Sequence, residues 1–357
     1  MDSNDQSEAS GMTQAMADPV SKSSAAKAVL PLIAAVLDEV FDPTAASPWA
    51  LLDFPGHANV GDSAIWLGTL ALLDRRFDQR PAYVTRHCEF PTQLDSVMPE
   101  GPVLLHGGGN FGDLWPGYWQ NRVALLTRFR HRRIVQMPQS IHFTGTEKDA
   151  LLQTQRAIAG HPDFTLLVRD TPSLDFAQRH FDCPVHLCPD MAFGLERLSA
   201  PQAPHVPVLA LMRTDPEGID HGPEAASLHR HAMVEDWVGR HKHPLRDRIA
   251  PKLCRKVPQL ARHLMRPQEA AFRRQAERHL HRGTALLGKG DVVVTDRLHG
   301  HILCSLMGKP HVVLDNSYGK LSNYIETWPD DGLTWRASSL AEAATQLRQM
   351  GVQLPSS

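Results

Sequence analysis

Residues 291–301 read DVVVTDRLHGH, and this stretch decides the fold class. Its three consecutive valines predict a short, fully buried strand, and the polar residues after them predict a loop that turns into a helix near His301. A strand that passes through a short loop into a helix is the repeating unit of α/β proteins. The loop also gathers Arg297 and His299 beside Gly300, so it is the first candidate for a binding site.

The same order of apolar strand, loop and helix recurs on both sides of this stretch. Strands are predicted at 49–54, 103–105, 134–137, 164–170, 185–187, 208–213 and 311–314. Helices are predicted at 30–40, from Ser63, at 121–130, at 171–179 and at 340–350. Short strands that are apolar throughout, with helices between them, predict parallel sheets covered on both faces.

A proline-rich segment divides this pattern. Residues 196–207 contain Pro201, Pro204 and Pro207 and predict a linker. We expect an N-terminal α/β domain at 27–195, a C-terminal α/β domain at 208–357 that ends in a helix, and a disordered tail at 1–26. The 357 residues suit this division, because a domain holds roughly 150 residues.

Composition excludes several classes of protein and site. Apolar residues make up 42% of the chain and the formal net charge is −2, so nothing indicates a nucleic-acid partner. The five cysteines form no Cys-x-x-Cys pair, and this favours a reducing cytoplasm over a disulfide scaffold. The apolar run 28–37 is too short for a membrane span, which needs about 20 residues. The His-x-His pairs lack matched ligands, so we expect no metal.

Residues 240–282 differ from the rest of the chain in charge. They contain thirteen Lys and Arg residues against three acidic residues. The segment fits a solvated helical insertion, and it also fits a patch for an anionic membrane surface or a lipid pyrophosphate. Nucleic acid fits less well, because Phe272 is the one aromatic residue there that stacks bases.

Four segments follow predicted strands, where ligands of open α/β sheets bind. The first is 59–62, in which Asp62 is either a helix cap or a base for a hydroxyl. The second is the glycine run 107–109 with Asn110, which lacks the lysine and spacing of a P-loop. The third is Arg169-Asp170, either a surface ion pair or an anion site, and the fourth is Arg297–His299.

At these segments the sequence resembles the polysaccharide pyruvyl transferase family. The matching segments, in order along the chain, are 56–70 (GHANVGDSAIWLGTL), 105–113 (LHGGGNFGD), 133–141 (RIVQMPQSI), 167–170 (LVRD), 188–193 (CPDMAF), 211–217 (LMRTDPE), 294–300 (VTDRLHG) and 308–320 (GKPHVVLDNSYGK). The likeness is greatest to bacterial exopolysaccharide members. The N-terminal tail and the basic segment 240–282 are not covered.

The resemblance implies two Rossmann-like domains that face a cleft, as in GT-B glycosyltransferases. It implies phosphoenolpyruvate as the donor, a pyruvate ketal on two hydroxyls of one sugar as the product, and no cofactor. The acceptor is a glycan, free or lipid-linked, and the enzyme works in the cytoplasm or against the inner face of the cytoplasmic membrane.

The resemblance also assigns donor contacts to Arg169, Arg297, Leu298 and His299. With it in view, we expect His299 as the acid, Asp62 as the base, and Arg213 and Lys320 as further donor ligands. The residues expected to bind the acceptor are Asn59, Gly108, Gly109, Asn110 and Gln139. Two alternatives stay open: a GT-B glycosyltransferase that uses a nucleotide sugar, and a non-catalytic module of polysaccharide assembly.

Overall fold

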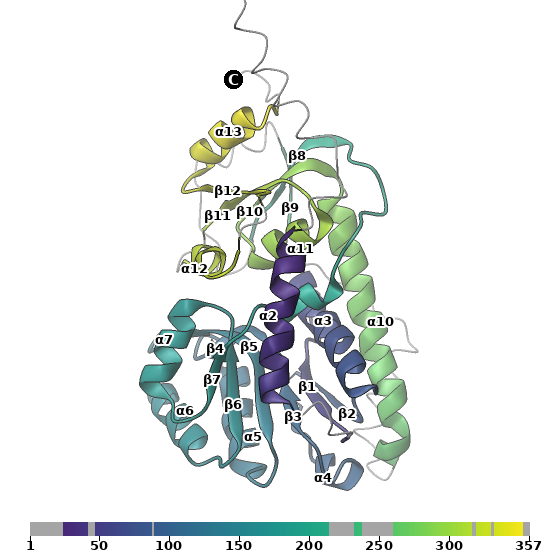
Figure 1. Cartoon of the computed structure of the whole chain (residues 1–357), viewed down its shortest axis with the longest axis vertical. Coiled ribbons are helices and arrows are strands. Elements are labelled where there is room, and N and C mark those ends of the chain that lie inside the picture. Colours follow the sequence, from purple (N-terminus) through teal and green to yellow (C-terminus); the bar gives the residue numbers. More distant parts are fainter. Residues whose placement is uncertain are drawn as a thin grey trace, which may run out of the picture.

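Two parallel β-sheets, each flanked by helices, form the structure, which is a computed structural model (Figure 1). It describes residues 24–41, 47–87, 89–213, 232–237, 260–315, 319–329 and 332–352. The mixed α/β class with parallel sheets, predicted from the apolar strands, is confirmed. Parallel neighbours need crossover connections, and helices supply most of them here.

The larger sheet has seven strands within the described residues. In chain order they are β1 (Ala50–Phe54), β2 (Tyr83–Arg86), β3 (Val103–Leu105), β4 (Gly108–Gly112), β5 (Ile134–His142), β6 (Phe164–Val168) and β7 (Val185–Leu187). Their spatial order is β2-β1-β3-β5-β6-β7, and β4 pairs with the second half of β5. The helical segments around this sheet are α3 (Val60–Phe77), α4 (Leu94–Val97), α5 (Pro116–Arg128), α6 (Ala150–Ala159), α7 (Thr171–His180) and the 3-10 helix η2 (Met191–Leu195).

The smaller sheet has the order β12-β11-β10-β8-β9. Its strands are β8 (Val206–Leu211), β9 (Met233–Glu235), β10 (Gly290–Thr295), β11 (His311–Leu314) and β12 (Thr334–Ala337). The remaining helices are α2 (Ser24–Val40), α10 (Ala261–Leu287), α11 (Leu298–Met307), α12 (Lys320–Thr327) and α13 (Leu340–Gln349). None of the helices that the structure describes is long and apolar enough to cross a membrane.

Residues 106–113 do not form the simple loop that their glycines predict. Gly108–Gly112 is strand β4, and β5 runs on to His142 instead of ending at Met137. Gly112 has a φ of 146°, and a Cβ there would lie 1.7 Å from the carbonyl oxygen of His142. Gly112 therefore permits a close approach of β4 and β5 that a side chain would prevent. In the glycine run itself, a Cβ at Gly107 would lie 2.8 Å from the carbonyl oxygen of Pro138.

Besides β4, three strands were not predicted: β2, β9 and β12. Each lies at the edge of its sheet, and each contains polar residues in a short segment. Edge strands are less completely buried than central ones, so they lack the continuous apolar run that marked the others.

The hydrophobic core is continuous between the two sheets. One cluster of buried side chains includes Leu51 of the larger sheet, Leu209 and Val293 of the smaller sheet, and Ile33 of α2. The helix predicted at 30–40 is confirmed as part of α2, and its Ile33 and Leu37 are buried. The helix begins at Ser24, inside the segment 1–26 predicted as a tail, while residues 1–23 lie outside the described residues.

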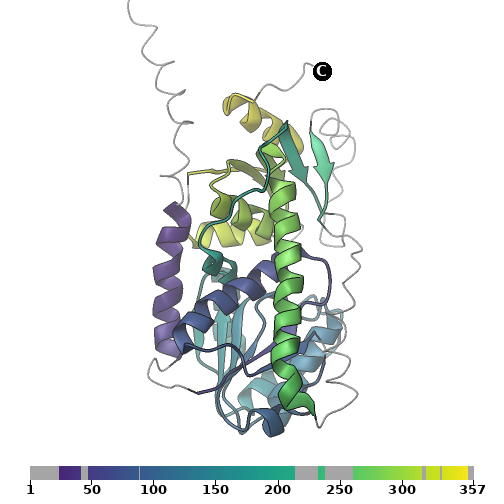
Figure 2. The same cartoon turned by 90° about the vertical axis from the view of Figure 1, so that its right-hand side faces the viewer.

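The basic segment 240–282 is only partly described. Residues 238–259 lie outside the described residues, and 261–282 belong to α10, which runs along the side of the molecule and over α3 (Figure 2). Phe272 stacks on Phe54 of β1 with ring centroids 4.3 Å apart, and Gln268 donates a hydrogen bond to the carbonyl of Val84 in β2. This part is a packed helix that joins the two sheets, which corrects the interpretation of a solvated insertion.

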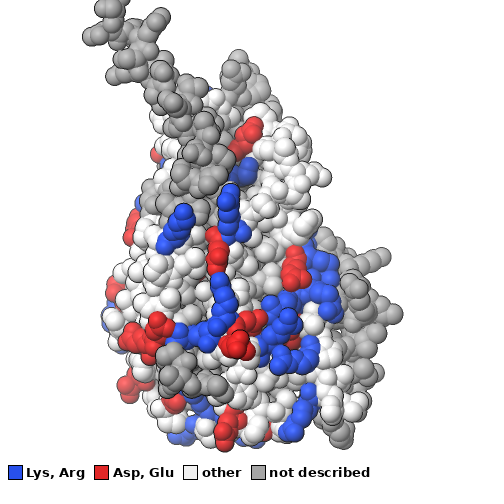
Figure 3. All heavy atoms as spheres, turned by 45° about the vertical axis from the view of Figure 1, so that its right-hand side comes forward, with Lys and Arg blue, Asp and Glu red and all other residues white. Residues whose placement is uncertain are grey.

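An arginine of α10 ties this helix to α3. Arg273 pairs with Glu269 and with Asp74 of α3, at 2.8 and 2.7 Å. Lys and Arg side chains on this side of the molecule lie among Asp and Glu side chains (Figure 3). Residues 196–205 connect η2 to β8 without a helix or strand, and the division into domains at 27–195 and 208–357 stays a prediction.

Candidate active site

A cavity of about 430 Å³ lies where strands of both sheets end. The larger sheet contributes residues that follow β1, β2 and β6, and the smaller sheet contributes residues that follow β8, β9 and β10. The residues lining it are His57, Ala58, Asn59, Asp62, His87, Gly109, Asn110, Trp115, Tyr118, Arg169, Arg213, Trp237, Arg297, Leu298 and His299. The carboxyl ends of parallel strands are the usual ligand site of α/β folds.

The segment after β1 places Asp62 in this cavity. Helix α3 begins at Val60, three residues before the predicted start, and Asn59 is its N-cap because its side chain accepts a hydrogen bond from the Gly61 amide. Asp62 accepts a hydrogen bond of 2.9 Å from the amide of Asn59, and its carboxylate lies 3.4 Å from His57. The cap and the candidate base are therefore different residues.

Asp190 joins two of the predicted donor residues. Its carboxylate lies 2.6 Å from Nη1 of Arg169 and 3.4 Å from Nε2 of His299, the second being an ion-pair distance longer than a good hydrogen bond. Arg169 and Asp190 are each 1% exposed, and Nε of Arg169 also donates to Ser140. Asp190 follows β7 and caps η2 by accepting from the Ala192 amide. Chain segments far apart in sequence thus meet at one buried carboxylate.

The environment of Asp190 fixes its ionisation. Burial by itself would raise its pKa, but the charge of His299, that of Arg169 and the amide of Ala192 outweigh burial and hold the pKa well below its usual range. Asp190 is therefore ionised at neutral pH and can hold the guanidinium of Arg169 and a protonated imidazole of His299 in place.

The ring of His299 lies against the first turn of α3. A Cβ added to Gly61 would lie 2.4 Å from Nδ1 and 2.8 Å from Cβ of His299. Gly61 therefore permits a close approach between α3 and α11, which carry the candidate base and the candidate acid. A search of the sequence for reactive or charged residue types passes over such a glycine, because its contribution is the absence of a side chain.

Gly61→Ala is expected to lower turnover tenfold to a hundredfold, because the added methyl group must displace the imidazole of His299, and misplacement by about 1 Å can cost 10²-fold in rate. Steady-state kinetics test this, with urea unfolding to show that the variant folds. Gly160→Ala is the control, because Gly160 has a helical backbone with a φ of −80°, an added Cβ would lie 3.1 Å from its nearest neighbour, and the residue does not line the cavity. Turnover equal to wild type in Gly61→Ala would contradict the placement of His299.

Arg297 is held by an acidic residue that the sequence did not single out. Its Nε and Nη2 donate to the two oxygens of Asp236, at 2.9 and 2.7 Å, and its guanidinium lies 5.9 Å from the centre of the Trp237 ring. Helix α11 begins at Leu298, earlier than predicted, so Leu298 and His299 form its first turn. Amide groups at a helix start, next to a fixed arginine, favour an anionic ligand.

Arg213 follows β8 and also lines the cavity. Its backbone amide donates to both oxygens of Asp296, at 2.9 and 3.1 Å. Burial raises the pKa of Asp296, and the Arg213 amide and the charges of Arg297 and Arg213 oppose that rise. Lys320 begins α12, but its side chain lies outside what the structure describes.

The predicted acceptor residues separate into two groups. Asn59, Gly109 and Asn110 line the cavity, whereas Gly108 and Gln139 do not. Gln139 is fully buried, donates to the carbonyl of His106 and accepts from the Asn110 amide. Its side chain thus ties β5 to the start of β4, and all five acceptor roles stay predictions.

The cavity also contains aromatic residues for which no role was predicted. His87 follows β2, Trp115 and Tyr118 lie at the start of α5, and Trp237 follows β9. His87 stacks on Tyr118 with ring centroids 3.6 Å apart. His87 could have been found by its position after a strand only if β2 had been predicted, and isolated aromatic residues such as Trp115 and Tyr118 give no signal in the sequence.

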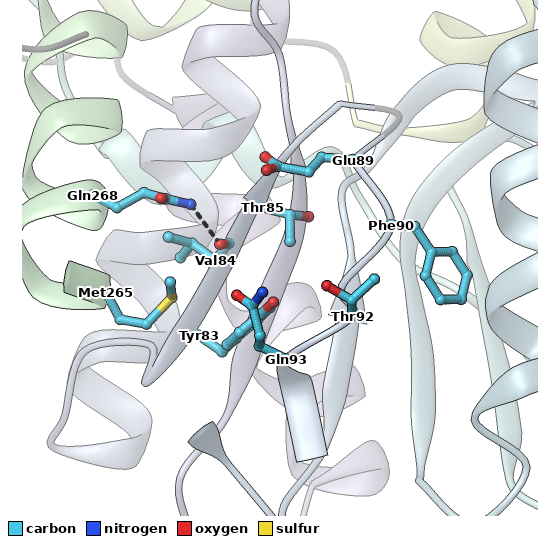
Figure 4. Close-up of a pocket in the computed structure, with 9 residues that line it drawn as sticks. All are labelled: Tyr83, Val84, Thr85, Glu89, Phe90, Thr92, Gln93, Met265 and Gln268. Atoms are coloured by element: carbon cyan, nitrogen blue, oxygen red, sulfur yellow. Dashed lines mark hydrogen bonds between the residues drawn. The ribbon is translucent and has the colours of Figure 1, made fainter. Parts of the chain in front are cut away.

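A second cavity, of about 240 Å³, lies between β2, the segment 89–93 and α10 (Figure 4). Its lining residues are Tyr83, Val84, Thr85, Glu89, Phe90, Thr92, Gln93, Met265 and Gln268. No lysine or arginine is among them, so this cavity is poorly suited to an anionic donor. No group of three or more His, Cys, Asp or Glu side chains in the described part of the chain is arranged to hold a metal.

Comparison with known proteins agrees with the residues gathered in the larger cavity. The sequence pattern of polysaccharide pyruvyl transferases matches residues 59–318. The chain is 34% identical to "Pyruvyl transferase 1" of Schizosaccharomyces pombe over 302 residues, which cover 78% of this chain and 69% of that protein. It is 31% identical to "Putative pyruvyl transferase EpsO" of Bacillus subtilis over 280 residues, covering 77% and 84%.

A solved structure shows a similar fold. It is that of an uncharacterized protein from Klebsiella pneumoniae, with a TM-score of 0.50 and 19% identity, and it covers 82% of this chain and 91% of its own. At this identity the likeness concerns the fold alone. The matched region 59–318 begins at Asn59 and includes Asp62, Arg169, Asp190 and the Arg297–His299 segment. The chain belongs to the polysaccharide pyruvyl transferase family.

Proposed function

We propose that the protein transfers the pyruvyl group of phosphoenolpyruvate to two hydroxyls of one sugar in an exopolysaccharide repeat unit or its precursor. The product is a pyruvate ketal, and phosphate is released. Family membership supports pyruvyl transfer to a polysaccharide. The observation that carries the finer proposal is a single cavity lined by three arginines, His299 and Asp62.

The arginines suit the charge of the donor. Phosphoenolpyruvate carries about three negative charges at neutral pH, shared between phosphate and carboxylate, and arginine binds both groups through charge-assisted hydrogen bonds. Arg169, Arg213 and Arg297 follow three different strands, so they can contact different ends of one small anion. The first turn of α11, at Leu298, adds backbone amides to this set.

His299 and Asp62 supply the acid and the base in this proposal. His299 gives a proton to the methylene carbon of the donor, and C2 becomes electrophilic. A sugar hydroxyl forms a bond to C2 while Asp62 accepts its proton. The C–O bond to phosphate then breaks, phosphate leaves with the bonding electron pair, and a second hydroxyl adds to C2 with loss of its proton. Two C–O bonds form, one breaks, and no electron is transferred to a cofactor.

The proposal extends to the architecture and the cellular site. Two Rossmann-like units that face the cavity, as in GT-B enzymes, suit a reaction that brings an anionic donor and a glycan together. The glycan is free or lipid-linked, and the enzyme works in the cytoplasm or at the inner face of the cytoplasmic membrane. Residues 240–259 carry seven Lys and Arg residues against Asp247, a composition that suits an anionic lipid surface.

Release of phosphate from phosphoenolpyruvate tests the reaction, measured with and without glycan fragments prepared from the host polysaccharide. We expect phosphate release only with a glycan, and mass spectrometry should show one pyruvyl increment on one sugar. Parallel assays with nucleotide sugars test the glycosyltransferase alternative. Nucleotide release without consumption of phosphoenolpyruvate would overturn the proposal in favour of that alternative.

Arg297→Ala is expected to weaken phosphoenolpyruvate binding at least tenfold, because a lost charge-assisted hydrogen bond costs about 1.5–3 kcal/mol. Calorimetric titration measures the dissociation constant, and circular dichroism shows whether the variant folds. Arg336→Ala is the matched control, because Arg336 pairs with Glu326 on the surface and does not line the cavity. Equal donor affinity in Arg297→Ala and wild type would remove Arg297 from the donor site.

A further inference from the structure

One part of the cavity is aromatic and half open to solvent. Trp115 is the N-cap residue of α5 and Tyr118 lies in the first turn, so the two are three residues apart and lie on the same side of the helix start. The Tyr118 amide donates to the Trp115 carbonyl at 3.0 Å, which fixes their relative position. His87 continues the surface, because its ring stacks on Tyr118 at 3.6 Å with an interplanar angle of 21°.

Trp115 is an exposed aromatic residue that lines the cavity. Large apolar side chains that are exposed in the described residues are Leu32, Trp115, Leu152 and Leu260, and of these only Trp115 lines the cavity. It is 40% exposed. An exposed aromatic side chain at the edge of a cavity is typical of a surface that a ligand covers.

The aromatic surface is uncharged at neutral pH. Burial, the larger cause, and the charge of His57 together lower the pKa of His87 to about 4, against the opposing effect of Asp62. Tyr118 and Trp115 are neutral as well. The larger cavity therefore combines a cationic part, with Arg169, Arg213 and Arg297, and a neutral aromatic part at His87, Trp115 and Tyr118.

We propose that Trp115, Tyr118 and His87 form the subsite on which a sugar ring of the acceptor stacks, and that they set acceptor affinity. This inference rests on the proposed function, since it assigns the acceptor half of the same cavity. A trianionic donor gains from arginine, whereas a pyranose presents a face of C–H groups that packs on an aromatic ring and a rim of hydroxyls that needs polar partners.

Polar residues near the aromatic surface can bind the hydroxyls at the rim of the sugar. Asp62 and Asn59 line the same cavity, and Asp62 is near enough to His87 to act on its ionisation. When a sugar stacks on Trp115 and Tyr118, a carboxylate and an amide in the same cavity are therefore available to hydrogen bond with the sugar hydroxyls. The stacked sugar ring is then held beside Asp62, the proposed base, while the arginines hold the donor.

Sugar binding without donor tests the subsite by saturation-transfer-difference NMR, with the methyl glycosides of glucose, galactose and mannose and glycan fragments from the host polysaccharide as probes. In wild type we expect the strongest transfer to the ring C–H protons of one sugar face. Trp115→Ala and Tyr118→Ala should reduce that transfer at least fivefold. Leu152→Ala is the matched control, because Leu152 is exposed on α6 and does not line the cavity.

Kinetics supply a second readout. In Trp115→Ala we expect KM for the glycan fragment to rise at least tenfold, with the dissociation constant of phosphoenolpyruvate within threefold of wild type. An unchanged acceptor KM, or no saturation transfer to any probe in wild type, overturns the subsite. Because sugar binding and donor binding are measured separately, the absence of pyruvyl transfer would refute the proposed function, and the NMR result alone would still decide the subsite.

Discussion

Replacement of His299 by glutamine is expected to lower turnover at least about a hundredfold while phosphoenolpyruvate still binds. Glutamine retains much of the side-chain volume and can hydrogen bond, but it cannot donate a proton to carbon at neutral pH. General acid catalysis contributes typically about 10²–10⁴-fold to an enzymatic rate. The imidazole lines the cavity and lies 3.4 Å from Asp190, where it is held between that carboxylate and the Gly61 backbone.

The measurement is a single-turnover rate with saturating donor and acceptor, together with a calorimetric titration of the donor. His131→Gln is the control, because His131 is half exposed, pairs with Asp95 and does not line the cavity. A loss confined to the rate constant would support His299 as the acid. A rate within threefold of wild type would leave His299 with a structural or donor-binding contribution only.

The sequence predicted the parts of the fold that depend on continuous apolar runs. The central strands β1, β3, β5, β6, β8, β10 and β11 all fall on such runs. Helix starts were placed less well, because α3 and α11 each begin within the polar loop that precedes their apolar residues. In α3 the N-cap is Asn59. Asp62 was a candidate for the cap because carboxylates also favour the start of a helix.

The donor residues could be predicted because each follows an apolar strand. Arg169 follows β6 and Arg297 follows β10, and strands that end at the same edge bring such residues together. Asp190 has the same position after β7, but nothing local indicated that it pairs with Arg169, 21 residues earlier. Ion pairs between elements depend on packing, which no single segment reveals.

The aromatic surface illustrates a different limit. Trp115 and Tyr118 are near the start of α5, which the sequence placed at residue 121. With the helix start misplaced, the two side chains were expected in a loop, and His87, which follows the unpredicted strand β2, gave no link between them. Only the placement of β2 beside β1, together with α5, brings the three side chains into one cavity.

Asp190→Asn is expected to destabilise the protein by about 3–5 kcal/mol, because it removes the charge partner of a buried guanidinium. The amide can still cap η2 by accepting from Ala192, so the loss reports mainly on the ion pairs. Urea unfolding measures the difference. Asp163→Asn is the matched control, because Asp163 forms an exposed pair with Arg133 at 3.2 Å, and such pairs contribute about 0–1 kcal/mol.

The pH dependence of this difference in unfolding free energy shows whether the charge of Asp190, and not the shape of its side chain, stabilises the protein. The folded-state pKa of Asp190 lies well below the unfolded value of about 3.9. Its contribution to stability is therefore complete above the unfolded pKa and is lost as the pH falls through the folded-state pKa. We expect a constant difference between wild type and Asp190→Asn from about pH 5.5 to 8, and a smaller one below about pH 4. A difference under 1 kcal/mol at pH 7 would show that the carboxylate of Asp190 does not hold the guanidinium of Arg169 in place.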